Sequence, residues 1–321
     1  MPVRVFSAGR VWCCTIDYFF KATTLPPSGF TTCPAAYSLM KTPKRLLPLI
    51  EDGLVDEVLY PLMSGKEASV YVVRAGSEIL CAKVYKDAAK RSFKQAVQYR
   101  EGRKGRNSRR QRAIEKGSKF GRTQQEQEWH NAEVDALYKL SAAGVRVPEP
   151  QGCFDGVLLM ELITDRDGEA APRLNDVSVP ADLALEDHAT MMDYVKLMLC
   201  AGLVHGDLSE FNVLVDEEGP IVIDLPQAVD AAGNNHARTM LERDVRNITQ
   251  YYGQFAPSLL NSNYAEEMWA LYEKGELKQD TQLTGEFTTT EVNADVDSVM
   301  LQIKEAYKEK LARDERMRED D

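Results

Sequence analysis

The polar residues with the clearest chemical pattern lie between positions 205 and 224. Asp207 is followed five residues later by Asn212, and Asp224 comes twelve residues after Asn212, at the end of a short apolar segment. Phosphoryl transfer needs one carboxylate to orient and deprotonate the attacking hydroxyl, together with hard oxygen ligands for Mg²⁺. The pattern of Asp207, Asn212 and Asp224 therefore indicates phosphoryl transfer, with one carboxylate for the proton and oxygen ligands for the metal. A hairpin with ordinary polar turns is the alternative, and chance should produce this pattern rarely.

A lysine and a glycine-containing turn precede this pattern. Lys83 lies in an apolar, strand-like context that matches the kinase strand whose lysine contacts the α- and β-phosphates of ATP. The turn at residues 64–68 lies about one strand earlier, and its backbone N–H groups could cover phosphates. Its single glycine makes it weaker than a G-x-G-x-x-G loop, so an ordinary turn and a surface lysine are the alternatives. We expect ATP to be bound by Gly65, Lys66, Glu67, Ala68 and Lys83.

The lysine needs an acidic partner on the helix that follows, and Glu133 is the candidate. Apolar residues at helical spacing predict a helix over 124–143, and Glu133 borders its apolar face, four residues from an apolar residue on either side. Glu126 and Glu128 compete for the role. A solvated glutamate is the alternative, but its place on the helix favours an inward-facing Glu133 that binds Lys83.

The elements that position these residues follow from hydrophobic periodicity. Alternating or continuous apolar segments predict strands over 69–74, 79–85 and 156–163, the first two joined as a hairpin through residues 75–77. Helical spacing predicts helices over 46–58, 124–143, 183–201 and 242–255, and residues 204–224 should contain a loop and two strands. In the first helix, Leu47, Ile50, Leu54 and Val58 form the expected apolar face, and Pro61 breaks it. Strands followed by helices predict an α+β fold with a β-rich and a helical lobe.

The domain boundaries are predicted from the same pattern. Residues 1–39 show no sustained period, so we expect them to be disordered, or added by a start site upstream of Met40. Residues 40–163 should form the N-lobe and residues 164–276 the C-lobe. The remainder, 277–321, should be a linker followed by a docking helix with an apolar stripe.

Charge is distributed unevenly along the 321 residues. The net charge is −11, yet residues 86–122 contain 14 Lys and Arg against 3 Asp and Glu, a local charge of +11. The glycines among these arginines predict a flexible loop over about 90–122. Such a loop could bind an anionic partner such as RNA, and a solvated basic loop without a partner is the alternative.

Composition excludes several other classes of protein. Hydrophobic residues make up 44% and charged residues 28%, which is typical of a folded enzyme. The six cysteines include no C-x-x-C pair, so neither a zinc site nor a disulfide framework is indicated. No apolar run approaches the roughly 18 residues of a membrane span. We therefore expect a cytoplasmic location and no contact with a membrane.

Three segments together carry a family resemblance. Gly-Lys-Glu-Ala at 65–68, His-Gly-Asp-Leu-Ser-Glu-Phe-Asn at 205–212 and Ile-Asp-Leu-Pro-Gln at 223–227 resemble the RIO family of atypical serine/threonine kinases, especially its first subfamily. The resemblance covers about Leu46 to Phe255 and also takes in Arg-Asp-Val-Arg-Asn-Ile at 243–248. It implies a trimmed, bilobal protein-kinase-like fold, ATP as substrate and Mg²⁺, or Mn²⁺, as cofactor. It also implies Asp207 as proton acceptor, Asn212 and Asp224 as metal ligands, and backbone contacts from Glu161 and Ile163 to adenine.

The same resemblance implies further properties. RIO enzymes carry a flexible basic loop where this chain has Lys90 to Arg122, and some act as ATPases on maturing ribosomal subunits. Asp224 would then be the site of a 4-aspartylphosphate intermediate. This chain departs from many relatives at Pro226, where they have Ser, and the fixed φ of proline should stiffen the turn.

Two other readings compete with this one. Small-molecule kinases of the aminoglycoside or choline phosphotransferase type also use His-Gly-Asp, but they usually have His-Pro-Gly-Asn where this chain has Ser-Glu-Phe-Asn at 209–212. The chain could also be a nucleotide-binding scaffold that grips RNA or a ribosomal particle through residues 90–122. Retention of Lys83, Asp207, Asn212 and Asp224 argues against a scaffold, which needs no proton acceptor.

Overall fold

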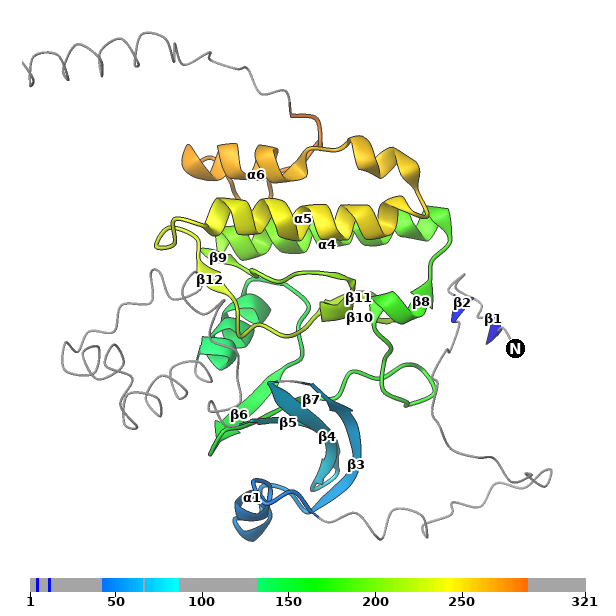
Figure 1. Cartoon of the computed structure of the whole chain (residues 1–321), viewed down its shortest axis with the longest axis vertical. Coiled ribbons are helices and arrows are strands. Elements are labelled where there is room, and N and C mark those ends of the chain that lie inside the picture. Colours follow the sequence, from blue (N-terminus) through cyan, green and yellow to red (C-terminus); the bar gives the residue numbers. More distant parts are fainter. Residues whose placement is uncertain (1–3, 6–10, 13–41, 66, 87–131, 288–321) are drawn as a thin grey trace, which may run out of the picture. The chain divides into compact units, whose positions relative to one another are not determined.

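A five-stranded antiparallel sheet builds the first part of the fold (Figure 1). The computed structural model describes residues 4–5, 11–12, 42–65, 67–86 and 132–287. The predicted hairpin is confirmed, with Gly76 adopting the positive φ of +62° that its two-residue turn requires. In sheet order the strands are β3 (Glu57–Ser64), β4 (Ala68–Ala75), β5 (Glu78–Tyr85), β7 (Val157–Glu161) and β6 (Pro150–Phe154).

Both edge strands of this sheet contain proline and an irregular register. Pro61 lies in β3 and Pro150 begins β6, and each strand shifts register beside its proline. β6 was not predicted, yet Asp155 and Gly156, with φ of 47° and 78°, form a tight turn that joins it to β7. Asp-Gly is a strong hairpin signal, because both turn residues need positive φ.

The expected helix over 46–58 is wrong in extent and in orientation. Helix α1 covers only Leu47–Glu51, and Gly53, at φ +70°, turns the chain toward β3. Leu47 and Leu54, assigned to the apolar face, are 43% and 38% exposed. The fully buried residues of this segment are Leu46, Leu49 and Val55, and two residues of the expected face, Ile50 and Val58, pack beside them.

The second part of the fold is mainly helical. Helices α4 (Ala181–Cys200), α5 (Ala237–Gly253) and α6 (Tyr264–Glu273) pack on one another (Figure 1). The two predicted helices over 183–201 and 242–255 are thus confirmed as α4 and α5, although α5 begins five residues earlier than expected. The short elements before α5 are η3 (Leu174–Asp176), β8 (Val177–Ser178), β9 (Leu203–Val204), η4 (Glu210–Asn212), β10 (Val213–Asp216), β11 (Gly219–Val222) and β12 (Val229–Asp230). After α5 comes η5 (Pro257–Asn261), which packs on that helix.

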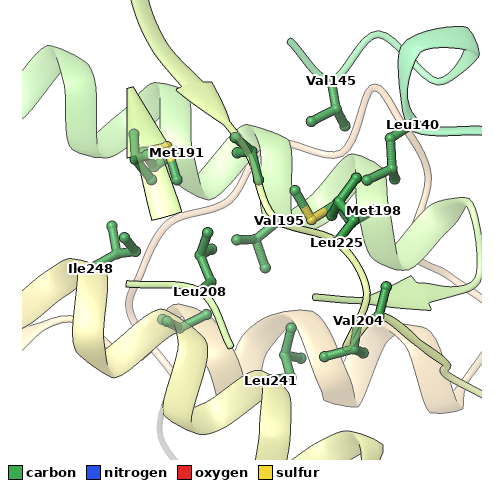
Figure 2. Close-up of a cluster of buried hydrophobic side chains, with 14 of the residues drawn as sticks. Leu140, Val145, Met191, Val195, Met198, Val204, Leu208, Leu225, Leu241 and Ile248 are labelled. Atoms are coloured by element: carbon green, nitrogen blue, oxygen red, sulfur yellow. The ribbon is translucent and has the colours of Figure 1, made fainter. Parts of the chain in front are cut away.

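The main hydrophobic core lies between these helices and the short strands (Figure 2). Leu208 and Leu225 are fully buried, and Figure 2 shows both side chains within the cluster that includes Val195 and Leu241. Each leucine directly follows one of the two aspartates predicted to do chemistry. The core therefore anchors the backbone next to Asp207 and Asp224.

Some predicted segments lie wholly or partly outside the described residues. These are Lys66, the basic loop 90–122, the beginning of the predicted helix 124–143 and the C-terminal helix beyond residue 287; the end of that predicted helix is present as residues 132–142. Within residues 1–39, the structure describes β1 (Arg4–Val5) and β2 (Val11–Trp12), and β2 pairs with β8. No helix in the described ranges is long and apolar enough to span a membrane.

Candidate active site

Lys83 joins the sheet to the helical part of the fold through two carboxylates. Its Nζ atom lies 2.6 Å from Oε1 of Glu133, on the helix over 132–142, and 2.7 Å from Oδ1 of Asp224, which follows β11. Glu133 is buried, and its second carboxylate oxygen accepts a hydrogen bond from the Tyr85 hydroxyl. Glu133 is thus held by two donors on β5, which fixes it beside Lys83.

Lys83 and Asp224 each stabilise the ionised form of the other. Burial lowers the pKa of Lys83, but the carboxylates of Glu133 and Asp224 outweigh burial and hold its pKa above the ordinary value. For Asp224, burial acts to raise the pKa, and the Lys83 ammonium outweighs it so that the pKa is lowered. Asp224 therefore stays ionised, as a metal ligand must be. Its φ of +67° lies in the left-handed region, which is uncommon for a residue other than glycine.

Asp207 and Asn212 lie on the loop and the short helix η4 that precede β10. The Asn212 amide nitrogen donates to the Asp207 backbone carbonyl at 2.9 Å, so its amide oxygen takes no part in this bond. Burial raises the pKa of the half-buried Asp207 carboxyl. Its Oδ2 atom accepts a hydrogen bond of 3.2 Å from the side chain of Gln227.

His205 connects the two aspartate segments. It is buried, its Nε2 lies 3.1 Å from the Ile223 carbonyl, and its Nδ1 accepts from the Asp207 backbone N–H at 3.2 Å. These partners fit the neutral ring with its proton on Nε2, and burial lowers the pKa of His205 to favour that form. The histidine therefore ties the backbone before Asp224 to the backbone of Asp207.

Three side chains of α5 hold the Asp207 loop from the other side. Asp244 is buried and accepts from the backbone N–H groups of Gly206, at 2.7 Å, and Leu208, at 3.1 Å. Arg243 donates to the Gly206 carbonyl, and Asn247 donates to the Leu208 carbonyl at 3.0 Å. These residues belong to the segment 243–248 that shares the family resemblance, but the sequence alone assigned them no role.

Asp244→Asn is expected to change how stability depends on pH. Burial raises the pKa of Asp244 from 3.8 to about 7, so between these values the folded chain holds a proton that the unfolded chain has lost. This contribution stabilises the fold at low pH and is lost as pH rises toward 7, with a slope of up to about 1.4 kcal/mol per pH unit. Denaturant unfolding of both proteins from about pH 4 to 8 measures the difference. A wild-type-to-variant difference that does not vary with pH would contradict the assignment.

The predicted phosphate-binding turn lies between β3 and β4. Gly65 donates its N–H to the Ala68 carbonyl at 2.9 Å, and Glu67 accepts from the Lys86 N–H at 2.7 Å. The Lys86 ammonium also reaches the Gly65 carbonyl at 2.5 Å. Lys83 on β5 pairs with Val70 on β4, and Val70 in turn pairs with Met63 on β3, the strand that precedes this turn. The turn and the lysine therefore belong to the same end of the sheet.

The two residues expected to contact adenine lie where the chain leaves the sheet. The Glu161 N–H already donates to the Glu149 carbonyl at 2.9 Å, so its carbonyl is the remaining candidate contact. The Ile163 carbonyl accepts from Ala171 at 2.9 Å, whereas its N–H has no partner among the described residues. Ile163 packs with Ala171 and Ile221, and Leu214 borders this apolar group.

Comparison with known proteins places the chain in a family. The model of the RIO domain matches residues 69–265, which is more than half of the chain. The chain belongs to the RIO-domain family. The matched residues include Lys83, Glu133, Asp207, Asn212 and Asp224.

Individual RIO proteins agree with this assignment. The RIO-type serine/threonine-protein kinase Rio1 of Haloferax volcanii is 34% identical over 205 residues, which are 64% of this chain and 66% of that protein. Human serine/threonine-protein kinase RIO1 is 31% identical over 216 residues, covering 66% of this chain and 36% of the human protein. The chain thus spans about two thirds or less of the length of these relatives.

A solved RIO structure shows the same fold. The Rio2 kinase of Chaetomium thermophilum, in an ADP/Mg²⁺-phosphoaspartate complex, matches with a TM-score of 0.51 and 20% identity, over 82% of this chain and 75% of that one. The predicted α+β, bilobal, protein-kinase-like fold is therefore confirmed for this RIO chain.

Proposed function

We propose that this chain is an ATP- and Mg²⁺-dependent serine/threonine protein kinase of the RIO type. One observation carries the proposal: Lys83 bridges Glu133 and Asp224, while Asp207 and Asn212 are held on the adjoining loop. Relatives that share the RIO domain are named as serine/threonine-protein kinases. A scaffold would have no use for the proton acceptor in this set.

Each side chain has a defined task in the reaction. Lys83, held by Glu133, contacts the α- and β-phosphates of ATP, and the turn at residues 65–68 covers them. Asp207 accepts the proton of the attacking hydroxyl while the hydroxyl oxygen bonds to the γ-phosphorus. The bond from that phosphorus to the bridging oxygen breaks, and ADP leaves with the electron pair. Backbone groups of Glu161 and Ile163 contact the adenine.

The described residues suit Mg²⁺ bound together with a nucleotide. Asp224 offers an ionised carboxylate and Asn212 an amide oxygen, whereas no group of three or more His, Cys, Asp or Glu in the described ranges could hold a metal by itself. Mg²⁺ commonly takes one or two protein oxygens and completes its shell with phosphates and water. Bound there, with Mn²⁺ as a substitute, it would neutralise charge on the phosphates.

Asp224 is also proposed as the site of a 4-aspartylphosphate intermediate. The Rio2 structure of similar fold is a phosphoaspartate complex. The intermediate would form when an Asp224 oxygen attacks the γ-phosphorus and ADP leaves, and water would then release phosphate. ATPase activity would follow without any protein substrate.

The remaining parts of the proposal concern organisation and partners. Residues 40–163 and 164–276 would form the two lobes, and residues 277–321 would carry a docking helix. The basic residues 90–122 would bind RNA or a ribosomal particle by charge, in the cytoplasm. Residues 1–39 would be dispensable for ATP binding.

Incubation with γ-labelled ATP and Mg²⁺ tests the proposed activity. We expect label on protein and in free phosphate, with part of the protein label released by hydroxylamine, which cleaves an acyl phosphate and leaves phosphoserine intact. Label that resists hydroxylamine and maps only to Ser or Thr would reject the aspartyl-phosphate step alone. Label transferred only to an added amino alcohol or aminoglycoside would favour a small-molecule kinase, and no turnover would favour a scaffold.

A further inference from the structure

The turn that follows Asp224 brings a second polar side chain against the proposed proton acceptor. Gln227 donates from Nε2 to Oδ2 of Asp207 at 3.2 Å, across 20 residues of sequence. An amide that donates to one oxygen of a carboxylate restricts rotation of that carboxylate, because the bond weakens as its angle departs from linear. The contact therefore selects which Asp207 oxygen faces the protein.

The turn is built to present Gln227 in one place. The Ala228 N–H donates to the Leu225 carbonyl at 3.0 Å, closing a four-residue turn with Pro226 second and Gln227 third. Proline fixes φ near −65°, the value that the second position of such a turn requires. Leu225 is fully buried in the core (Figure 2), so the start of the turn cannot shift easily.

Neighbouring side chains hold the Asp207 backbone. The Asn212 amide donates to the Asp207 carbonyl, His205 accepts the Asp207 N–H, and Arg243 donates to the Gly206 carbonyl. These contacts fix where the aspartate lies, and the Asn212 side chain also acts on its carboxylate. The Gln227 amide adds a restraint on that carboxylate from the other aspartate segment.

We propose that Gln227 is a positioning residue that holds Asp207 by Oδ2 and so directs Oδ1 at the attacking hydroxyl. The inference rests on the proposed function and deepens it. The hydroxyl proton passes to Oδ1 while the hydroxyl oxygen bonds to the γ-phosphorus, and ADP leaves with the electron pair. Gln227 itself neither gains nor loses a proton.

Steady-state kinetics of Gln227→Ala test the proposal. We expect kcat to fall about 10- to 100-fold, with KM for ATP within about twofold. Gln227→Asn, which keeps the amide but withdraws it by one methylene, should lose a similar amount. Gln227→Glu should lose more above the pKa of both acids, because two carboxylates would then face each other. Gln250→Ala, at an exposed position on α5, is the matched control and should match wild type.

A double-mutant cycle shows whether Gln227 acts through Asp207. In an Asp207→Asn background, Gln227→Ala should lower kcat by less than about twofold. An equal loss in both backgrounds, or a rise in KM without a change in kcat, would overturn the positioning role. Wild-type protein that transfers no phosphate would instead reject the proposed function. Melting temperatures of all variants identify any that fail to fold, and the two remaining Gln227 variants then decide.

Discussion

Asp207→Asn is expected to lower turnover about 10²- to 10⁴-fold while nucleotide affinity stays within about twofold. The amide has almost the shape of the carboxylate, and the backbone around it remains held by His205, Asp244 and Asn212. The amide cannot accept a proton, however, and the substitution takes away no contact between the protein and the nucleotide. The loss should therefore appear in kcat, measured with labelled ATP, and be absent from the ADP dissociation constant.

Two results would contradict this assignment. Turnover within tenfold of wild type would mean that another group accepts the proton. A parallel loss of nucleotide affinity would place Asp207 in the binding site instead. Asp182→Asn, the same change at an exposed position on α4, is the matched control and should leave both quantities unchanged.

Asp224→Asn should weaken nucleotide binding about 100-fold when Mg²⁺ is present, because it replaces a charged ligand with a neutral one. The variant also loses the ion pair with Lys83, which keeps Glu133 as its partner. In EDTA, where no Mg²⁺ links the phosphates to the protein, wild type and variant should bind ADP with nearly equal affinity. Calorimetric titrations in the two buffers measure the difference.

An equal loss of ADP affinity with and without Mg²⁺ would contradict a role as metal ligand. It would show that Asp224 acts through Lys83 alone. Asp224→Asn should also abolish hydroxylamine-sensitive labelling. Asp207→Asn keeps Asp224, the aspartate that this labelling needs. The two substitutions therefore separate proton transfer from metal and phosphate binding.

Local sequence spacing was enough to select most of the candidate site. Asp207, Asn212 and Asp224 lie on one short segment of loop and hairpin, where spacing along the chain translates directly into position. Glu133 could be chosen over Glu126 and Glu128 because helical spacing defines which face is buried, and the structure places Glu133 against Lys83. In both cases the residue could be chosen from spacing within one element or at one element boundary.

Contacts between distant elements could not be predicted in the same way. Asp244 reads as one of many polar residues on α5, and only the packing of that helix against the Asp207 loop shows two N–H groups donating to it. Gln227 reaches Asp207 through a turn whose direction depends on the left-handed backbone of Asp224. The prediction at residues 46–58 was wrong because a helix of five residues has too few turns to define a buried face.

The two outer strands of the sheet affect how the protein behaves at high concentration. An edge strand exposes unpaired N–H and C=O groups that can recruit a strand from another molecule, which is a common start of aggregation. In β3 and β6 a proline removes one donor, and a register shift beside it disturbs the regular spacing that a new strand would need. Both edges of this sheet are therefore poor templates for intermolecular strand addition. Replacing Pro61 and Pro150 would remove that protection.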